Sequence, residues 1–155
     1  MGMANTYTQI YIQVVIVVKG RNCLIPNDKK EMLYKYMTGI IQNKNHKLIS
    51  INGISNHIHF LIGLNTAESL SELIKEVKRC STNYINEKKW IKGKFSWQEG
   101  FGGFSYSRSQ INRVVKYIEN QEHHHKKKTF REEYIELLKK FEVTYNKKFI
   151  FKEVE

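Results

Sequence analysis

The chain has 155 residues, of which 41% are hydrophobic, enough for one packed domain over residues 1–155. With 26 lysines and arginines against 15 acidic residues, its formal net charge is +11, which favours nucleic acid as a partner over a membrane surface. The sequence has no apolar run near the ~20 residues of a membrane-spanning helix and no secretion-signal pattern, and Cys23 and Cys80 alone make neither a disulfide framework nor a zinc site. We therefore expect a cytoplasmic protein without a membrane partner.

The first third of the chain predicts a strand, a helix and a hairpin. Residues 7–18 are rich in β-branched and aromatic side chains, as in a central strand. A helix follows, with Asp28 and Glu31 spaced as in a capping box. Residues 47–51 predict a short strand, and Asn52-Gly53 predicts a type I′ turn that leads into the next strand.

The second helix begins at Ser69 and carries basic residues beside its apolar stripe. Lys75, Lys78 and Arg79 lie off that stripe. A solvated helix face explains each of them singly, but with the net charge they are candidates for contacts to nucleic-acid phosphates.

The glycine-rich segment after this helix predicts a strand over residues 95–98 and then a flexible joint over residues 100–106. Gly100, Gly102 and Gly103 are the residues that would allow the chain to swing there.

Two further helices are predicted beyond the joint. One begins at Ser107 or Ser109 and runs to about residue 127, the other covers residues 132–141, and residues 143–154 could add a strand. The run His123-His124-His125 lies at the end of the first of these helices, where positive charge interacts favourably with the helix dipole, so a structural role is favoured for it.

The order strand, helix, strand, strand, helix, strand predicts an α+β protein with the ferredoxin-like split βαβ fold. An antiparallel sheet would carry two helices on one face. We expect this core at about residues 5–99, with the carboxyl-terminal helices appended over residues 107–155. RNA-recognition modules share this arrangement, so the fold leaves function open.

A His-x-His pair lies in the strand that follows the predicted turn. Because side chains alternate in a strand, His57 and His59 share one face, while Ile58, Phe60 and Ile62 form the apolar face. Two imidazoles that point the same way can chelate one metal ion. A half-exposed strand that carries two histidines by chance is the alternative at this point.

A tyrosine and a glutamine form a second polar pair on the helix after the joint. Tyr117 lies off the apolar stripe of that helix, and Gln121 follows one turn later on the same side. Taken alone, the two could be an ordinary surface pair.

Three motifs together resemble the single-tyrosine HUH transposases of short bacterial insertion sequences, which include the transposases associated with repetitive extragenic palindromes (REP). The motifs are residues 56–61 (Asn-His-Ile-His-Phe-Leu), residues 97–105 (Trp-Gln-Glu-Gly-Phe-Gly-Gly-Phe-Ser) and residues 115–121 (Val-Lys-Tyr-Ile-Glu-Asn-Gln) with His124-His125. The resemblance spans residues 7–141, and one departure is Phe101, where the family has tyrosine.

The resemblance implies that Tyr117 is the nucleophile and that His57, His59 and Gln121 bind a divalent metal ion, Mg²⁺ or Mn²⁺. It further implies cleavage and rejoining of single-stranded DNA through a covalent 5′-phosphotyrosine intermediate, at hairpin-containing ends of a mobile element. A homodimer is expected, in which the histidines of one subunit meet the tyrosine of the other. The flexible joint would let the tyrosine helix reach the other subunit, and an open sheet edge beside the first strand would allow two subunits to pair.

Two other functions remain open from the sequence. A plasmid relaxase or replication initiator shares the histidines and the tyrosine, but the chain is compact and has no helicase segment. A non-catalytic single-stranded nucleic-acid-binding module of the RNA-recognition type would need stacking aromatic residues on its central strands and no metal.

Overall fold

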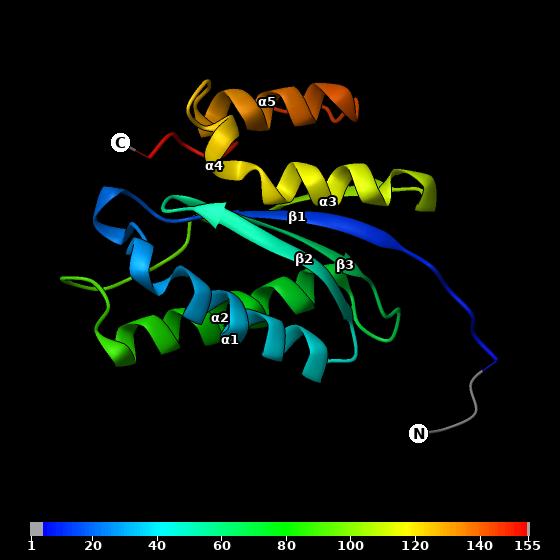
Figure 1. Cartoon of the computed structure of the whole chain (residues 1–155), viewed down its shortest axis with the longest axis horizontal. Coiled ribbons are helices and arrows are strands. Elements are labelled where there is room, and N and C mark those ends of the chain that lie inside the picture. Colours follow the sequence, from blue (N-terminus) through cyan, green and yellow to red (C-terminus); the bar gives the residue numbers. More distant parts are fainter. Residues whose placement is uncertain (1–4, 155) are drawn as a thin grey trace.

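In the computed structural model, which describes residues 5–154, four strands form one antiparallel sheet in the order β2-β3-β1-β4. Two long helices cover one face of this sheet (Figure 1). The strands are β1 Tyr11–Val17, β2 Lys47–Ile54, β3 His57–Gly63 and β4 Gly102–Tyr106, and the two helices are α1 Lys30–Asn43 and α2 Leu70–Lys88. This is the predicted ferredoxin-like arrangement.

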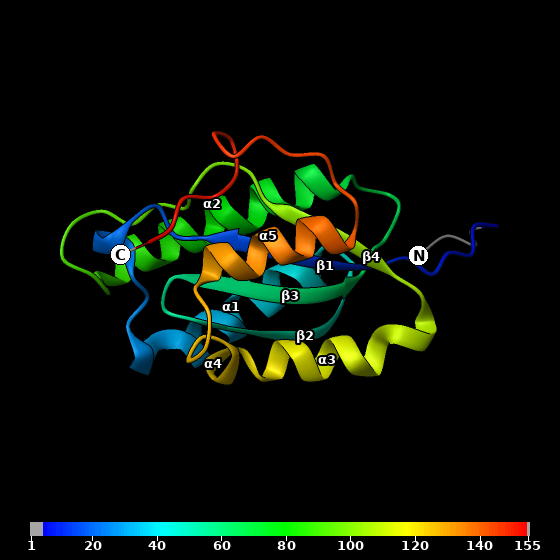
Figure 2. The ribbon, with the colours of Figure 1, turned by 90° about the horizontal axis from the view of Figure 1, so that it is seen from above.

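The opposite face of the sheet is covered by the carboxyl-terminal helices (Figures 1 and 2). These are α3 Ile111–Glu119, α4 Gln121–His124 and α5 Phe130–Lys140. Leu61 of β3 packs on this side against Ile111, Val114 and Ile118, whereas Ile58, Phe60 and Ile62 belong to the larger core. The histidine face of β3 is therefore enclosed.

The hairpin turn lies three residues beyond its predicted place. Asn52 and Gly53 belong to β2 and pair with His59 and Ile58. Gly53 allows β3 to lie close to β2, since a Cβ at position 53 would overlap the carbonyl oxygen of His57. Ser55 and Asn56 make the turn.

The predicted joint over residues 100–106 is wrong, because β4 occupies most of it. Gly102 pairs with Val15 and Gly103 with Val14. A Cβ on Gly102 would lie 2.7 Å from the ring of Tyr134, so this glycine admits α5 close to the sheet. Of the three glycines in this segment, Gly100, at φ +83°, is the one with the left-handed backbone that favours glycine.

The predicted strand over residues 95–98 is reduced to one bridge between Val18 and Trp97, and the sheet core extends to residue 106 instead of ending at 99. A short 3₁₀ turn, Arg108–Gln110, with a capping box at Ser107, then leads directly into α3. Helix α3, which carries Tyr117, is thus joined to β4 through this single short turn. Two other short 3₁₀ turns are Arg21–Cys23 and Asn27–Lys29.

Strand β1 is interior, since it pairs with β3 on one side and β4 on the other. The open edge expected beside it is therefore absent from the described sheet, whose edges are β2 and β4. Residues 143–154 add no strand, and their buried members Phe151 and Val154 join the core, where the Phe151 ring lies against Tyr134. None of the described helices is long and apolar enough to cross a bilayer.

Candidate metal centre and tyrosine

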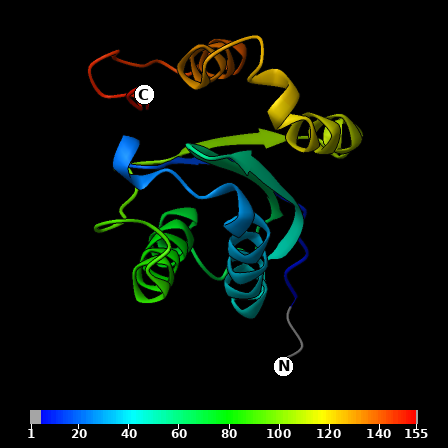
Figure 3. The same ribbon diagram turned by 60° about the vertical axis from the view of Figure 1, so that its left-hand side comes forward.

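Strand β3 brings His57 and His59 onto one face, as predicted, with their ring centroids 5.0 Å apart. Both side chains are fully buried, because α3, α4 and α5 cover that face. Figure 3 shows these helices on one side of the sheet and α1 and α2 on the other. The two rings thus lie between the sheet and the carboxyl-terminal helices.

A break in the predicted long helix directs Gln121 toward the histidines. Asn52 of β2 donates from Nδ2 to the carbonyl oxygens of Ile118 (3.0 Å) and Glu119 (3.1 Å), the last residues of α3. The helix ends there, instead of continuing to residue 127, and α4 begins at Gln121. The Oε1 atom of Gln121 lies 2.9 Å from Nε2 of His57.

The buried carboxylate of Glu133, on α5, lies at the centre of the site. Its Oε1 atom is 3.1 Å from Nε2 of His59, 3.1 Å from Nε2 of His125 and 3.5 Å from Nε2 of His57. Its Oε2 atom accepts hydrogen bonds from the Tyr117 hydroxyl and from Nε2 of Gln121, the latter at 3.2 Å.

Sequence reasoning missed Glu133 and His125. His125 belongs to the run that was interpreted as a helix end, and the chain instead turns there so that His125 faces the site. Glu133 could have been found. It occupies a core position of α5, between the buried residues Phe130 and Tyr134, where an unpaired carboxylate would be costly.

Two of the imidazoles are oriented for a cation. Nδ1 of His57 lies 2.6 Å from the side-chain oxygen of Asn56, and Nδ1 of His125 lies 3.1 Å from the carbonyl oxygen of Lys128. These oxygens only accept hydrogen bonds, so in the neutral rings the protons are on Nδ1 and the Nε2 atoms carry lone pairs. The lone pairs face Oε1 of Gln121 and of Glu133, which are acceptors too.

Converging acceptors with no proton between them fit a divalent metal ion. The ligand atoms of His57, His125 and Glu133 lie within 4.8 Å of one another. Gln121, predicted as a ligand, adjoins this group, and His59 is joined to it through Glu133.

Burial and neighbouring charges shift the pKa values of the titratable groups in the site in different directions. Burial lowers the pKa of His57 to about 4, although the neighbouring carboxylate opposes this. Burial alone would raise the pKa of Glu133, but the close contacts of its carboxylate with the imidazoles of His125, His57 and His59 hold it well below its ordinary value. Burial and the Glu133 charge raise the pKa of Tyr117. The site therefore holds a neutral imidazole, a carboxylate and a protonated phenol.

Tyr117 lies beside the histidines of its own chain. Its ring meets the His59 ring edge-on at 5.8 Å between centroids, and the His124 ring lies 4.7 Å away on another side. The off-stripe position of Tyr117 therefore places it in the site. No exchange of helices between subunits is needed to bring the tyrosine and the histidines together.

The basic residues predicted on α2 lie on the other side of the sheet from this site (Figure 1). Lys78 donates to the carbonyl oxygens of Gln98 and Gly100, and Arg79 pairs with Glu76 on its own helix. Lys75 is exposed. Two of the three thus have partners within the chain.

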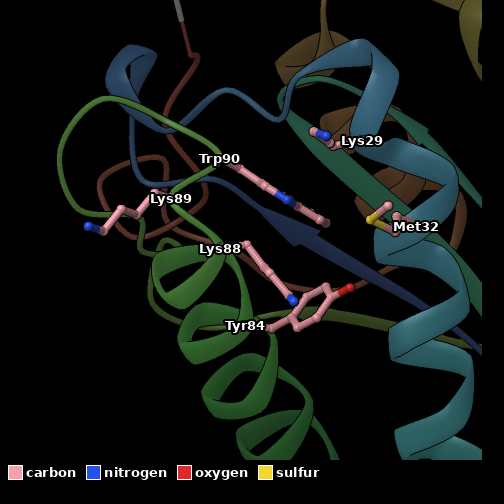
Figure 4. Close-up of a pocket in the computed structure, with 6 residues that line it drawn as sticks. All are labelled: Lys29, Met32, Tyr84, Lys88, Lys89 and Trp90. Carbon is pink, nitrogen blue, oxygen red and sulfur yellow. The ribbon is translucent and has the colours of Figure 1, made fainter.

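A second group of basic side chains lies on the same side of the sheet as α2. These lysines line a pocket between the start of α1 and the end of α2 (Figure 4). Tyr84 stacks on Tyr36 with ring centroids 4.0 Å apart and meets Trp90 edge-on at 5.2 Å. The pocket is lined by Lys29, Met32, Tyr84, Lys88, Lys89 and Trp90.

Comparisons with known proteins agree with this architecture. A candidate transposase from Deinococcus radiodurans is 16% identical, with a TM-score of 0.57, over 78% of this chain and 97% of its own. A REP-associated tyrosine transposase bound to a REP hairpin is also 16% identical, with a TM-score of 0.59, over 81% of this chain and 74% of its own. No curated protein matches the sequence. Residues 6–121 match the family described as "Transposase IS200 like", which confirms the resemblance, and the chain belongs to this transposase family.

Proposed function

We propose that this protein cleaves and rejoins single-stranded DNA at the ends of a mobile element, with Tyr117 as nucleophile. The observation that carries the proposal is the convergence on one carboxylate, Glu133, of the Tyr117 hydroxyl and the imidazoles of His57, His59 and His125. A buried ionised carboxylate is costly to maintain for stability alone.

Each residue has a chemical task in this proposal. A phenol is a weak nucleophile at neutral pH, since its ordinary pKa is ~10. Glu133 Oε2 accepts the hydrogen bond of the Tyr117 hydroxyl and is placed to take its proton. The phenolic oxygen then bonds to phosphorus, the bond from phosphorus to the 3′ oxygen breaks, and that oxygen gains a proton. The 5′-phosphotyrosine keeps the bond energy, so the free 3′-hydroxyl can reverse the step.

We propose His57, His59 and Gln121 as metal ligands, joined by His125 and Glu133. These residues would hold a divalent cation, which would supply neutralisation of charge on the scissile phosphate and help to orient it. Either Mg²⁺ or Mn²⁺ suits the carboxylate and amide oxygens, and Mn²⁺ tolerates imidazole better.

The proposed substrate is hairpin-containing single-stranded DNA. The REP-associated transposase with this fold was solved with a hairpin, and the net charge of +11 suits a polyanion. Lys126 and Lys127 follow His125 directly and are exposed, which makes them candidates for phosphate contacts. In the pocket of Figure 4, Trp90 with its flanking lysines is a second candidate contact.

The non-catalytic alternative is less well supported. A module of the RNA-recognition type binds nucleic acid on its open sheet face. Here α3, α4 and α5 cover the face that α1 and α2 leave free. The relaxase alternative shares the proposed chemistry and differs in its DNA substrate.

We propose that each active site belongs to one chain, also if the protein forms the homodimer expected from its family. Tyr117 and the proposed metal ligands lie together within a single chain. The two features expected to favour exchange of helices do not support it, because most of the predicted joint forms strand β4 and β1 is an interior strand. The cytoplasm is the proposed location, where the DNA substrate is present.

The test is formation of a covalent protein–DNA product. Hairpin-containing single-stranded DNA incubated with the protein and Mn²⁺ should give a DNA-linked protein band on a denaturing gel, and a chelator should abolish it. Tight DNA binding without any such band, over hairpins of varied sequence, would leave a binding module as the better account.

A further inference from the structure

Gln13 is a buried polar residue to which the proposed reaction gives no task. It lies in β1 with its side chain fully buried. Its Nε2 atom is 2.9 Å from Nδ1 of His59, and its Oε1 atom accepts a hydrogen bond of 2.6 Å from the Tyr106 hydroxyl. The amide thus links β4 to the proposed metal ligand.

This contact gives His59 the opposite proton arrangement from His57 and His125. An amide nitrogen only donates, so Nδ1 of His59 accepts and the proton of the neutral ring is on Nε2. Glu133 Oε1 receives that proton in a hydrogen bond of 3.1 Å. Of the three rings, His59 alone presents an N–H group to the centre of the site.

A ring that ligates a cation through Nε2 must carry its proton on Nδ1 and needs an acceptor there. We infer that Gln13 is the positioning residue that supplies this acceptor, by turning its amide so that Oε1 replaces Nε2 beside His59. The inference rests on the proposed metal centre. His59 stays neutral in the exchange, since Nε2 releases one proton to solvent and Nδ1 takes one up.

Tyr106 holds the amide in the orientation that the structure shows. Its hydroxyl proton lies on Gln13 Oε1, the atom that would have to turn toward His59. After the turn, Gln13 Nε2 donates to the Tyr106 oxygen, and the hydroxyl proton points elsewhere. Tyr106 is only partly buried, so water can accept that proton. Loss of the Tyr106 hydroxyl should therefore ease the turn, whereas loss of the Gln13 amide should prevent it.

Two substitutions with opposite expected effects test this. In Mn²⁺ titrations followed by calorimetry, Gln13→Met should weaken binding about 10- to 100-fold, the range for loss of an outer-shell partner. Tyr106→Phe should strengthen binding about fivefold, the value of one ordinary hydrogen bond. A purely structural role for the Tyr106–Gln13 contact predicts weaker binding in both variants.

The proton position on His59 gives a readout that needs no metal. In ¹⁵N NMR of the metal-free protein, wild-type His59 should carry its proton on Nε2. Gln13→Glu offers only acceptors, so there Nδ1 should be protonated. Circular dichroism establishes that each variant is folded, and the Glu variant carries the test if the Met variant is not.

The inference is overturned by wild-type Mn²⁺ affinity in Gln13→Met, or by the same His59 protonation in wild type and Gln13→Glu. If the wild-type protein itself binds no Mn²⁺, the proposed metal centre is wrong, whatever the NMR result. The two failures are therefore distinguishable.

Discussion

A Tyr117→Phe protein should bind hairpin DNA as tightly as the wild type and form no covalent DNA product. The phenylalanine ring can keep the contacts with the His59 and His124 rings but lacks the attacking oxygen. Loss of a nucleophile lowers catalysis on the order of 10⁴-fold or more. Gel-shift binding and a denaturing gel with end-labelled DNA measure the two properties separately.

Tyr36→Phe is the matched control, because Tyr36 stacks on Tyr84 on the far side of the sheet. It should leave the covalent product unchanged. A covalent product that persists in Tyr117→Phe would assign the nucleophile to another residue.

Glu133→Gln should reduce cleavage by about 10²- to 10⁴-fold, the range for a general base. The substitution keeps the shape of the side chain but removes the charge that faces three imidazoles and the acceptor for the Tyr117 proton. Mn²⁺ binding should weaken as well. Single-turnover cleavage rates and calorimetric titration give the two effects.

The neighbouring Glu132→Gln is its control, since Glu132 is exposed and its capping bond to the Thr129 N–H can be kept by a glutamine oxygen. It should behave as wild type. Equal cleavage rates in the two variants would remove Glu133 from the mechanism.

Periodicity and motif spacing predicted the elements that build the site. Alternation in β3 placed His57 and His59 on one face, and the helical repeat placed Tyr117 off the apolar stripe. Both predictions depend only on local geometry, which neighbouring residues determine. The ferredoxin-like order followed from the succession of strands and helices.

The errors arose where tertiary contacts override local signals. Asn52-Gly53 has the composition of a turn, but the Asn52 side chain is used to end α3 and Gly53 to let β3 approach. The glycine-rich sequence around Gly102 predicts a flexible segment, yet the ring of Tyr134 and the pairing with β1 hold Gly102 in the sheet. Neither partner is near in sequence, so no local pattern contains the information.

Glu133 was missed for a related reason. Its helix is predicted over residues 132–141 without a partner for Glu133, which lies on the buried side of that helix. A carboxylate at a core position indicates a cationic or hydrogen-bonding partner across the fold. Only the folded chain shows that the partners are the imidazoles and Tyr117.

The central claim is that one chain carries both the nucleophile and the metal ligands, and mixing inactive variants tests it most directly. His57→Ala and Tyr117→Phe proteins, carrying different tags, are mixed under conditions in which co-purification of the tags establishes whether subunits exchange. If each site lies within one chain, every site in the mixture keeps one lesion, and the mixture should form no covalent DNA product. If sites are shared, a mixed dimer contains one intact site, and recovery of the covalent product on mixing would contradict the account.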